Sequence, residues 1–178
     1  MLLHERMHLT TILRDNMISP STNRQLRETV VGNLSAHFSK AEMACRCCGG
    51  LRIEPLLIDA LEQLRSLAAT EVVVHDGYRC HAHNQEVGGV TDSEHTRGMA
   101  ADVGIPGLSL QQMYELALQV PTFAKGGIGV YDGGFLHLDI RPHAARWARV
   151  RGQYVGIQHL VKQPLTLLAK TPSNSQPG

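Results

Sequence analysis

The chain has 178 residues, of which 43% are hydrophobic, and its 17 basic residues are almost balanced by 16 acidic ones. A chain of this length buries one core of ordinary size, so we expect a single folded domain. The balanced charge gives no field that would attract a polyanion, and no stretch approaches the roughly 20 apolar residues that cross a bilayer, so neither nucleic acid binding nor membrane insertion is expected.

The two ends of the chain differ in composition from its middle. Residues 1–35 are mixed and polar, and residues 161–178 run into a tail rich in Pro, Ser, Asn and Gly that cannot bury enough apolar surface to become ordered. Charged and histidine residues interrupt the first 15 positions, so we expect no signal peptide. We therefore predict an N-terminal extension over 1–35, a folded domain over 36–160 and a disordered tail over 161–178.

Two segments in the middle are predicted to be amphipathic helices. The first begins near Pro55, and the second follows Ser109, which suits an N-cap. Apolar residues recur at helical spacing in both. In the first helix these residues are Leu57, Leu61, Leu64 and Ala68. In the second they are Met113, Leu116, Ala117 and Val120. A β-branched run over 71–76 lies between them and predicts a strand.

A β-hairpin is predicted over 126–142. Two alternating strands flank the turn Asp132-Gly133-Gly134, and Pro142 ends the second strand. Because strand side chains alternate between faces, His137 and Asp139 lie on the same face, backed by apolar residues on the other. A polar pair of this kind indicates a functional face.

The segment SEHTRGMAAD, residues 93–102, places His95 and Asp102 seven positions apart. A catalytic zinc ion takes three His, Asp or Glu ligands and leaves a fourth position for water. His95, Asp102 and His137 would form such a set, and Gly98 would let the backbone turn between the first two. Histidines near glycine-rich loops are also common as surface residues, and this chain has 10 of them, so spacing alone leaves both interpretations open.

Longer motifs connect the chain to a family. SEHTRGMAAD fits the S-x-H-x-x-G-x-A-x-D pattern of the M15 family of zinc D-alanyl-D-alanine peptidases. The segments DGYRCHAHNQEVGGVTDSEH and GGIGVYDGGFLHLDIRP are similar to neighbouring blocks of that family, and HFSKAEMACRCCGG resembles an upstream segment. The resemblance runs from about His37 to Trp147.

The resemblance implies a zinc peptidase or amidase of bacterial cell-wall peptides. It implies an α+β fold shared with the hedgehog signalling domain and the lysostaphin-type enzymes, in which helices flank a small antiparallel sheet that carries the zinc site. It places His95, Asp102 and His137 on the zinc ligands. Arg79 falls on an arginine that holds a substrate carboxylate or the developing oxyanion, and Ser93 falls on a serine that supports the site. Tyr131 lies in a matched block and is expected to line the cleft.

The general base departs from part of the family's pattern. Such a base takes a proton from zinc-bound water and returns it to the leaving amine. Many members place an acid three residues before the last histidine ligand, where this chain has Gly134. We favour Asp139 as the base and place Asp132 second. The alternative for Asp139 is that it orients a ligand or Arg141.

The cysteines leave three alternatives open. Cys45, Cys47 and Cys48 lie together, and Cys80 follows in GYRC. Four cysteines in a chain this long do not make a disulfide scaffold. We favour free thiols over a structural zinc at Cys45 and Cys48 and over a disulfide to Cys80.

Three functions follow from these observations. We favour a monomeric peptidase with one catalytic Zn²⁺ that acts on peptidoglycan peptides, as a carboxypeptidase that removes a terminal D-alanine or as an endopeptidase that cuts a cross-link. The second is a non-catalytic zinc-containing module that binds wall peptides or a protein, which Gly134 at the usual base position supports. The third is a component of a phage particle. The expected lack of a signal peptide favours a phage or prophage origin, with synthesis in the cytoplasm and action at the wall.

Overall fold

The structure is a computed structural model that describes residues 33–162, and the account below concerns that part of the chain. The extension predicted over 1–35 and the tail predicted over 161–178 lie outside the described residues except at 33–35 and 161–162, so both stay predictions. Within the described range, no helix has the length and apolar character that crossing a membrane requires.

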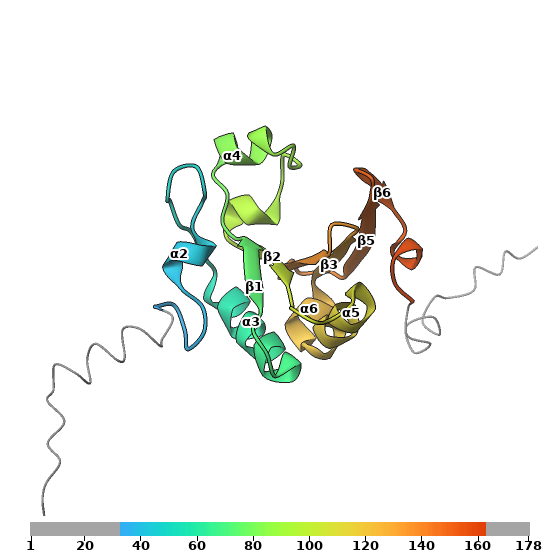
Figure 1. The fold of residues 1–178 in the computed structure, drawn as a ribbon. Coiled ribbons are helices and arrows are strands. Elements are labelled where there is room, and N and C mark those ends of the chain that lie inside the picture. The colour runs from blue at the N-terminus through green and yellow to red at the C-terminus, as the bar shows by residue number, and fades with distance from the viewer. Residues whose placement is uncertain (1–32, 163–178) are drawn as a thin grey trace, which may run out of the picture. The chain divides into compact units, whose positions relative to one another are not determined.

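A six-stranded sheet forms the centre of the fold, with the strand order β1-β2-β4-β3-β5-β6 (Figure 1). The strands are β1 Val73–Asp76, β2 Ala100–Gly104, β3 Gly127–Tyr131, β4 Phe135–Asp139, β5 Ala145–Val150 and β6 Gln153–Val155. The α+β class is confirmed. The sheet was predicted to be antiparallel, and one pairing corrects this, because β5 runs parallel to β3. The chain reverses after β4 and reaches the free side of β3, where it runs in the same direction as β3.

Both predicted long helices are present, as α3 Pro55–Ala68 and α5 Leu110–Gln119. Pro55 occupies the first turn of α3, and Ser109 caps α5 through a reciprocal pair of hydrogen bonds with Gln112. The hairpin of β3 and β4 also lies where it was predicted, around residues 132–134. Shorter helices complete the described part: α2 Lys40–Met43, α4 His81–Glu86, α6 Pro121–Lys125 and the 3-10 turns η1 Glu94–Arg97 and η2 Ile157–His159.

One face of the sheet is apolar and packs against helices. Figure 1 shows α3, α5 and α6 gathered at one side of the sheet and α4 away from them. The buried strand side chains on this face are Ala101, Val103, Ile128, Val130, Leu136 and Leu138. Each fully buried aliphatic side chain of Val or Leu size stabilises the fold by about 1.5–3 kcal/mol. Since strand side chains alternate, the same strands turn Asp102, His137 and Asp139 toward the opposite face.

Candidate active site and metal centre

The side chains of His95, Asp102 and His137 converge on the polar face of the sheet. His95 comes from η1, and the β2–β4 ladder places Asp102 directly opposite His137. His95 Nε2 lies 3.0 Å from His137 Nδ1 and 3.2 Å from Asp102 Oδ1, and His137 Nδ1 lies 3.0 Å from Asp102 Oδ1. In a tetrahedral zinc site with bonds of about 2.0 Å, ligand atoms lie about 3.3 Å apart. The three atoms therefore have the spacing that a zinc ion requires.

The outer nitrogen of each imidazole ring is held by an acceptor. His95 Nδ1 lies 2.6 Å from the Gly77 carbonyl oxygen, and His137 Nε2 lies 3.0 Å from Asp139 Oδ2. Because carbonyl and carboxylate oxygens accept, a neutral ring in either position donates its proton outward and directs the lone pair of its other nitrogen toward Asp102. In that neutral form, His95 Nε2, His137 Nδ1 and Asp102 Oδ1 present lone pairs to one another, and a proton or another cation between them relieves the repulsion. Such a group needs a cation, so the residues fit a metal ion.

The charges around the site favour that cation. Burial alone would lower the pKa of His137, but hydrogen bonds to the carboxylates of Asp102 and Asp139, together with their charges, raise it to about 9. Burial would raise the pKa of Asp102, yet His95 and His137 hold it far below its usual range. The carboxylates are therefore ionised, and the pocket stabilises positive charge between them.

Arg79 is tied to the same group. Its Nη2 donates to Asp102 Oδ2 over 2.7 Å, and its Nε donates to Asp76 Oδ2 over 2.6 Å. Among the described residues, Nη1 of Arg79 has no hydrogen-bond partner, and the side chain lines a cavity. Asp76 was not predicted as part of the site. Its position three residues before Arg79, at the end of a strand, is the signal that could have revealed it.

A cavity of about 440 Å³ opens over the three candidate ligands. Its volume is within the range of small-molecule pockets. Ser93 and Tyr131, both predicted to contact substrate, line this cavity, as do the acids Glu94 and Asp132. Tyr131 stacks on Phe135 with ring centroids 4.5 Å apart, and burial raises the pKa of the Tyr131 phenol to about 12, so it remains a hydrogen-bond donor at neutral pH.

Residues 36–139, which include the three candidate ligands, match the family model for peptidase M15. The chain belongs to the peptidase M15 family. It is 35% identical over 103 residues to the peptidoglycan L,D-endopeptidase MepK of Escherichia coli strain K12, and equally to the MepK proteins of Escherichia coli O157:H7 and Shigella flexneri. Each match covers 53% of this chain and 54% of the relative, so the chain spans about half the length of the curated relatives it matches.

In this M15 domain, the carboxylate of Asp139 is fully buried and surrounded by donors. It accepts from Gly127 N–H over 2.9 Å, from Arg141 Nε over 2.8 Å and from His137 Nε2 over 3.0 Å. Burial would raise its pKa, but the bonds from His137 and Arg141 hold it far below the usual range. Asp139 does not line the cavity. Of the two roles predicted for it, the geometry favours orienting His137 over transferring a proton.

Trp147, in β5, was not predicted as a site residue. Its ring centroid lies 5.3 Å from that of His137, and the guanidinium of Arg141 lies 5.2 Å from the centroid of the indole. The indole lines the cavity, and its buried Nε1 has no hydrogen-bond partner among the described residues. The strand pairing that brings Trp147 here is between β3 and β5, and the order of residues along the chain gives no indication of it.

Gly98 joins η1 to β2, as the motif predicted. Its φ of 71° lies in the left-handed region, and a Cβ atom there would lie 2.4 Å from the Arg52 carbonyl oxygen. Glu54 N–H donates to the Gly98 carbonyl oxygen over 2.9 Å, so the turn is fixed against the start of α3. The turn sets His95 and Asp102 on adjoining elements that converge.

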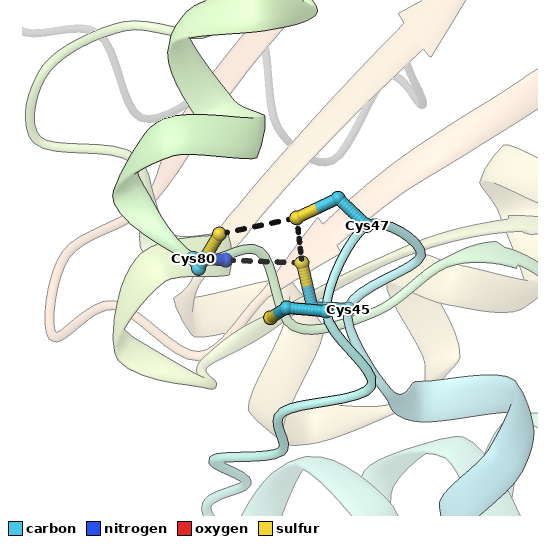
Figure 2. A group of neighbouring side chains, drawn as sticks. Cys45, Cys47 and Cys80 are labelled. Carbon is cyan, nitrogen blue, oxygen red and sulfur yellow. Dashed lines mark hydrogen bonds between the residues drawn. The ribbon is translucent and has the colours of Figure 1, made fainter.

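The four cysteines lie close together, and none of them lines the cavity over the candidate ligands. Figure 2 shows Cys45 and Cys47 on one loop with their sulfur atoms directed toward Cys80, which precedes α4. The sulfur atoms of Cys45, Cys47, Cys48 and Cys80 all lie within 4.8 Å of one another. None of them forms a disulfide in this structure.

Proposed function

We propose that this chain is a zinc-dependent peptidase that hydrolyses peptide bonds in peptidoglycan. One observation carries the proposal: three potential ligand atoms of His95, Asp102 and His137 lie 3.0–3.2 Å from one another beside a cavity that can admit a substrate. The M15 family is zinc-dependent in general, which supports the same metal here. The names of the MepK relatives support peptidoglycan as the substrate.

The three proposed ligands would leave the zinc ion free to take part in hydrolysis. Held by His95, Asp102 and His137, the ion would have one open position, and it would supply Lewis-acid polarisation of a carbonyl and a water pKa of about 7. Arg79 holds the outer oxygen of Asp102 and keeps Nη1 for an anionic oxygen of the substrate. Ser93 and Tyr131 line the cavity in which the peptide would lie, and the Tyr131 hydroxyl can donate to it.

The proton acceptor is proposed to be Asp132. Unlike Asp139, Asp132 lines the cavity, and it lies in the β3–β4 turn only two residues before Gly134. Its Oδ2 accepts from Arg151 N–H over 2.7 Å, which leaves Oδ1 for a proton. Two further acids line the cavity, Asp92 and Glu94, but Arg97 lies 3.9 Å from the carboxylate of Asp92 and donates to that of Glu94 over 3.3 Å.

Of the two peptidase activities, we propose the endopeptidase. The three similar MepK proteins are named endopeptidases, which supports this choice over carboxypeptidase. The two activities give different products, because an endopeptidase opens cross-linked peptides and a carboxypeptidase releases D-alanine.

The test uses the full chain and purified peptidoglycan. Metal content is measured by elemental analysis, and cross-linked and uncross-linked peptides are separated after incubation with and without a chelator. We expect cleavage of cross-links that the chelator stops and added zinc restores. If the wild-type chain binds zinc that His137→Ala does not bind, yet cleaves no wall peptide, the result would favour the non-catalytic binding module. If the two proteins bind the same amount of zinc, both the peptidase and the zinc-containing binding module are overturned.

A further inference from the structure

The cysteine group has the spacing of a tetrahedral metal site. Cys45 Sγ lies 3.5 Å from Cys47 Sγ, and Cys47 Sγ lies 3.4 Å from Cys80 Sγ. With zinc–sulfur bonds of about 2.3 Å, tetrahedral sulfur atoms lie about 3.8 Å apart. A disulfide needs a separation of about 2.0 Å and would use only two of the four sulfurs. All four sulfur atoms lie within 4.8 Å of one another, which suits a single ion held by the whole group.

The first loop, residues 45–50, is folded so that the thiols of Cys45, Cys47 and Cys48 lie close together. Gly49 N–H donates to the Cys45 carbonyl oxygen and Cys45 N–H donates to the Gly50 carbonyl oxygen, both over 2.8 Å. These bonds close a turn that contains Cys47 and Cys48. The guanidinium of Arg46 donates to the His75 carbonyl oxygen and so ties the turn to β1.

The second segment, residues 77–80, is brought against the first by close backbone contacts. Tyr78 N–H donates to the Met43 carbonyl oxygen over 2.8 Å, and a Cβ atom on Gly77 would lie 2.6 Å from that same oxygen. Only glycine allows this approach at position 77. The approach places Cys80 beside the turn of the first loop, although 35 positions separate Cys80 from Cys45.

Backbone amides already donate to two of the sulfurs. Cys80 N–H lies 3.3 Å from Cys45 Sγ, and His83 N–H lies 3.4 Å from Cys80 Sγ. Hydrogen bonds of this kind stabilise the negative charge of metal-bound thiolates. A site of four thiolates and no other ligand is typical of structural zinc and leaves no position for a substrate.

We propose that Cys45, Cys47, Cys48 and Cys80 bind one structural zinc ion as thiolates, releasing their protons to solvent. Residues 77–80 also carry the Gly77 carbonyl that orients His95 and the guanidinium of Arg79 that holds Asp102. Insofar as the proposed function is right, the cysteine-bound zinc fixes the segment that positions two ligands of the catalytic ion. The thiolate site itself stands independently of that function.

Cobalt substitution of the full chain tests the thiolate site separately from the histidine site. Cobalt bound by thiolates gives an intense sulfur-to-metal charge-transfer absorption, which a site of two histidines and one aspartate lacks. We expect this absorption in the wild-type chain and, unchanged, in His137→Ala. We expect it to be lost in a Cys47→Ser, Cys80→Ser double variant and retained in His81→Ala, a control at an exposed residue next to Cys80.

Zinc counting gives the second measurement. We expect two zinc ions per chain in the wild type, one in His137→Ala and one in the double cysteine variant, whose Tm falls by about 10 °C or more. A wild-type protein purified under reducing conditions that shows no thiolate absorption with cobalt, or that contains a disulfide between Cys47 and Cys80, would overturn the proposal. If only the proposed function fails, His137→Ala binds as much zinc as the wild type, and the thiolate absorption remains.

Discussion

The ligand atoms of His95, Asp102 and His137 lie on two paired strands and a 3-10 turn, whereas the four cysteine sulfurs lie on two loops. In the first group an outer hydrogen bond fixes each ring, and a cavity opens beside the ligand atoms. In the second group four sulfur atoms lie within 4.8 Å of one another. The two proposed metal sites of this domain therefore differ in the number of ligands and in the hydrogen bonds that orient them. Three oriented ligands leave room for chemistry, and four thiols close the site.

Among the variants that test this difference between the two sites, His137→Ala is expected to have the largest effect on peptidoglycan cleavage. The variant removes one of three ligands from the proposed catalytic site and none from the cysteine site, so we expect cleavage of peptidoglycan to fall by about a thousandfold or more. The matched control is His143→Ala at an exposed position, with wild-type activity expected. Retention of wild-type turnover by His137→Ala would show that the histidine group is not catalytic.

Asp132→Asn tests the proposed proton acceptor of the histidine-containing site. We expect cleavage to fall by about 10²–10⁴-fold, since general base catalysis contributes that much, with zinc content unchanged. The comparison variant is Glu94→Gln, measured by the same assay of cross-linked peptides. If Asp132→Asn keeps full turnover and Glu94→Gln does not, the base is Glu94.

Arg79→Lys is expected to lower cleavage by about 10²–10³-fold. A lysine ammonium cannot hold Asp76 and Asp102 in one fork while offering a further donor to substrate. The control is Arg52→Lys at an exposed position, for which we expect no change. Both variants should retain the thiolate absorption with cobalt, because neither removes a cysteine. Unchanged kcat and KM in Arg79→Lys would contradict a direct role for the guanidinium.

Asp139→Asn separates the two roles predicted for this residue. If Asp139 orients His137, zinc affinity falls by about 10–100-fold, and saturating zinc restores cleavage. Zinc titration monitored by activity measures both quantities, and circular dichroism checks that the variant is folded. Activity that stays lost at saturating zinc in a folded variant would make Asp139 the base after all.

The smallest expected effect is on the pH dependence of the Tm of the metal-free protein. The pKa of His137 rises from about 6.5 when unfolded to about 9 when folded, so its protonation stabilises the fold fully below pH 6.5. This stabilisation is lost as pH rises through 9. We expect the Tm of the chelated protein to fall by several degrees over this interval from this cause, and by less in His137→Ala. Equal slopes for both proteins would show that His137 does not carry the proton.

The sequence was most informative where the signal is local. The helical spacing of Leu57, Leu61 and Leu64 predicted α3, and the alternation around His137 predicted its strand and its shared face with Asp139. The motif spacing predicted that His95, Asp102 and His137 would be candidates for one metal, and the structure brings these three together.

Contacts between distant segments could not be predicted in the same way. The strand β5 places arginine beside alanine and tryptophan, which hides its alternation, and its position depends on parallel pairing with β3. The contact of Cys80 with Cys45 depends on backbone packing around Met43 and Gly77, which no residue spacing encodes. The short α4 and α6 have too few residues for a periodic signal.

The direct opposition of Asp102 and His137 across the β2–β4 ladder has a consequence for folding. Slippage of β4 by one residue would turn His137 into the apolar core and bring Leu136 or Leu138 to the polar face. A chain with that error could not assemble the three ligand atoms. Metal binding at this position would thus act as a check on strand register, because only the correctly paired sheet would gain the binding free energy.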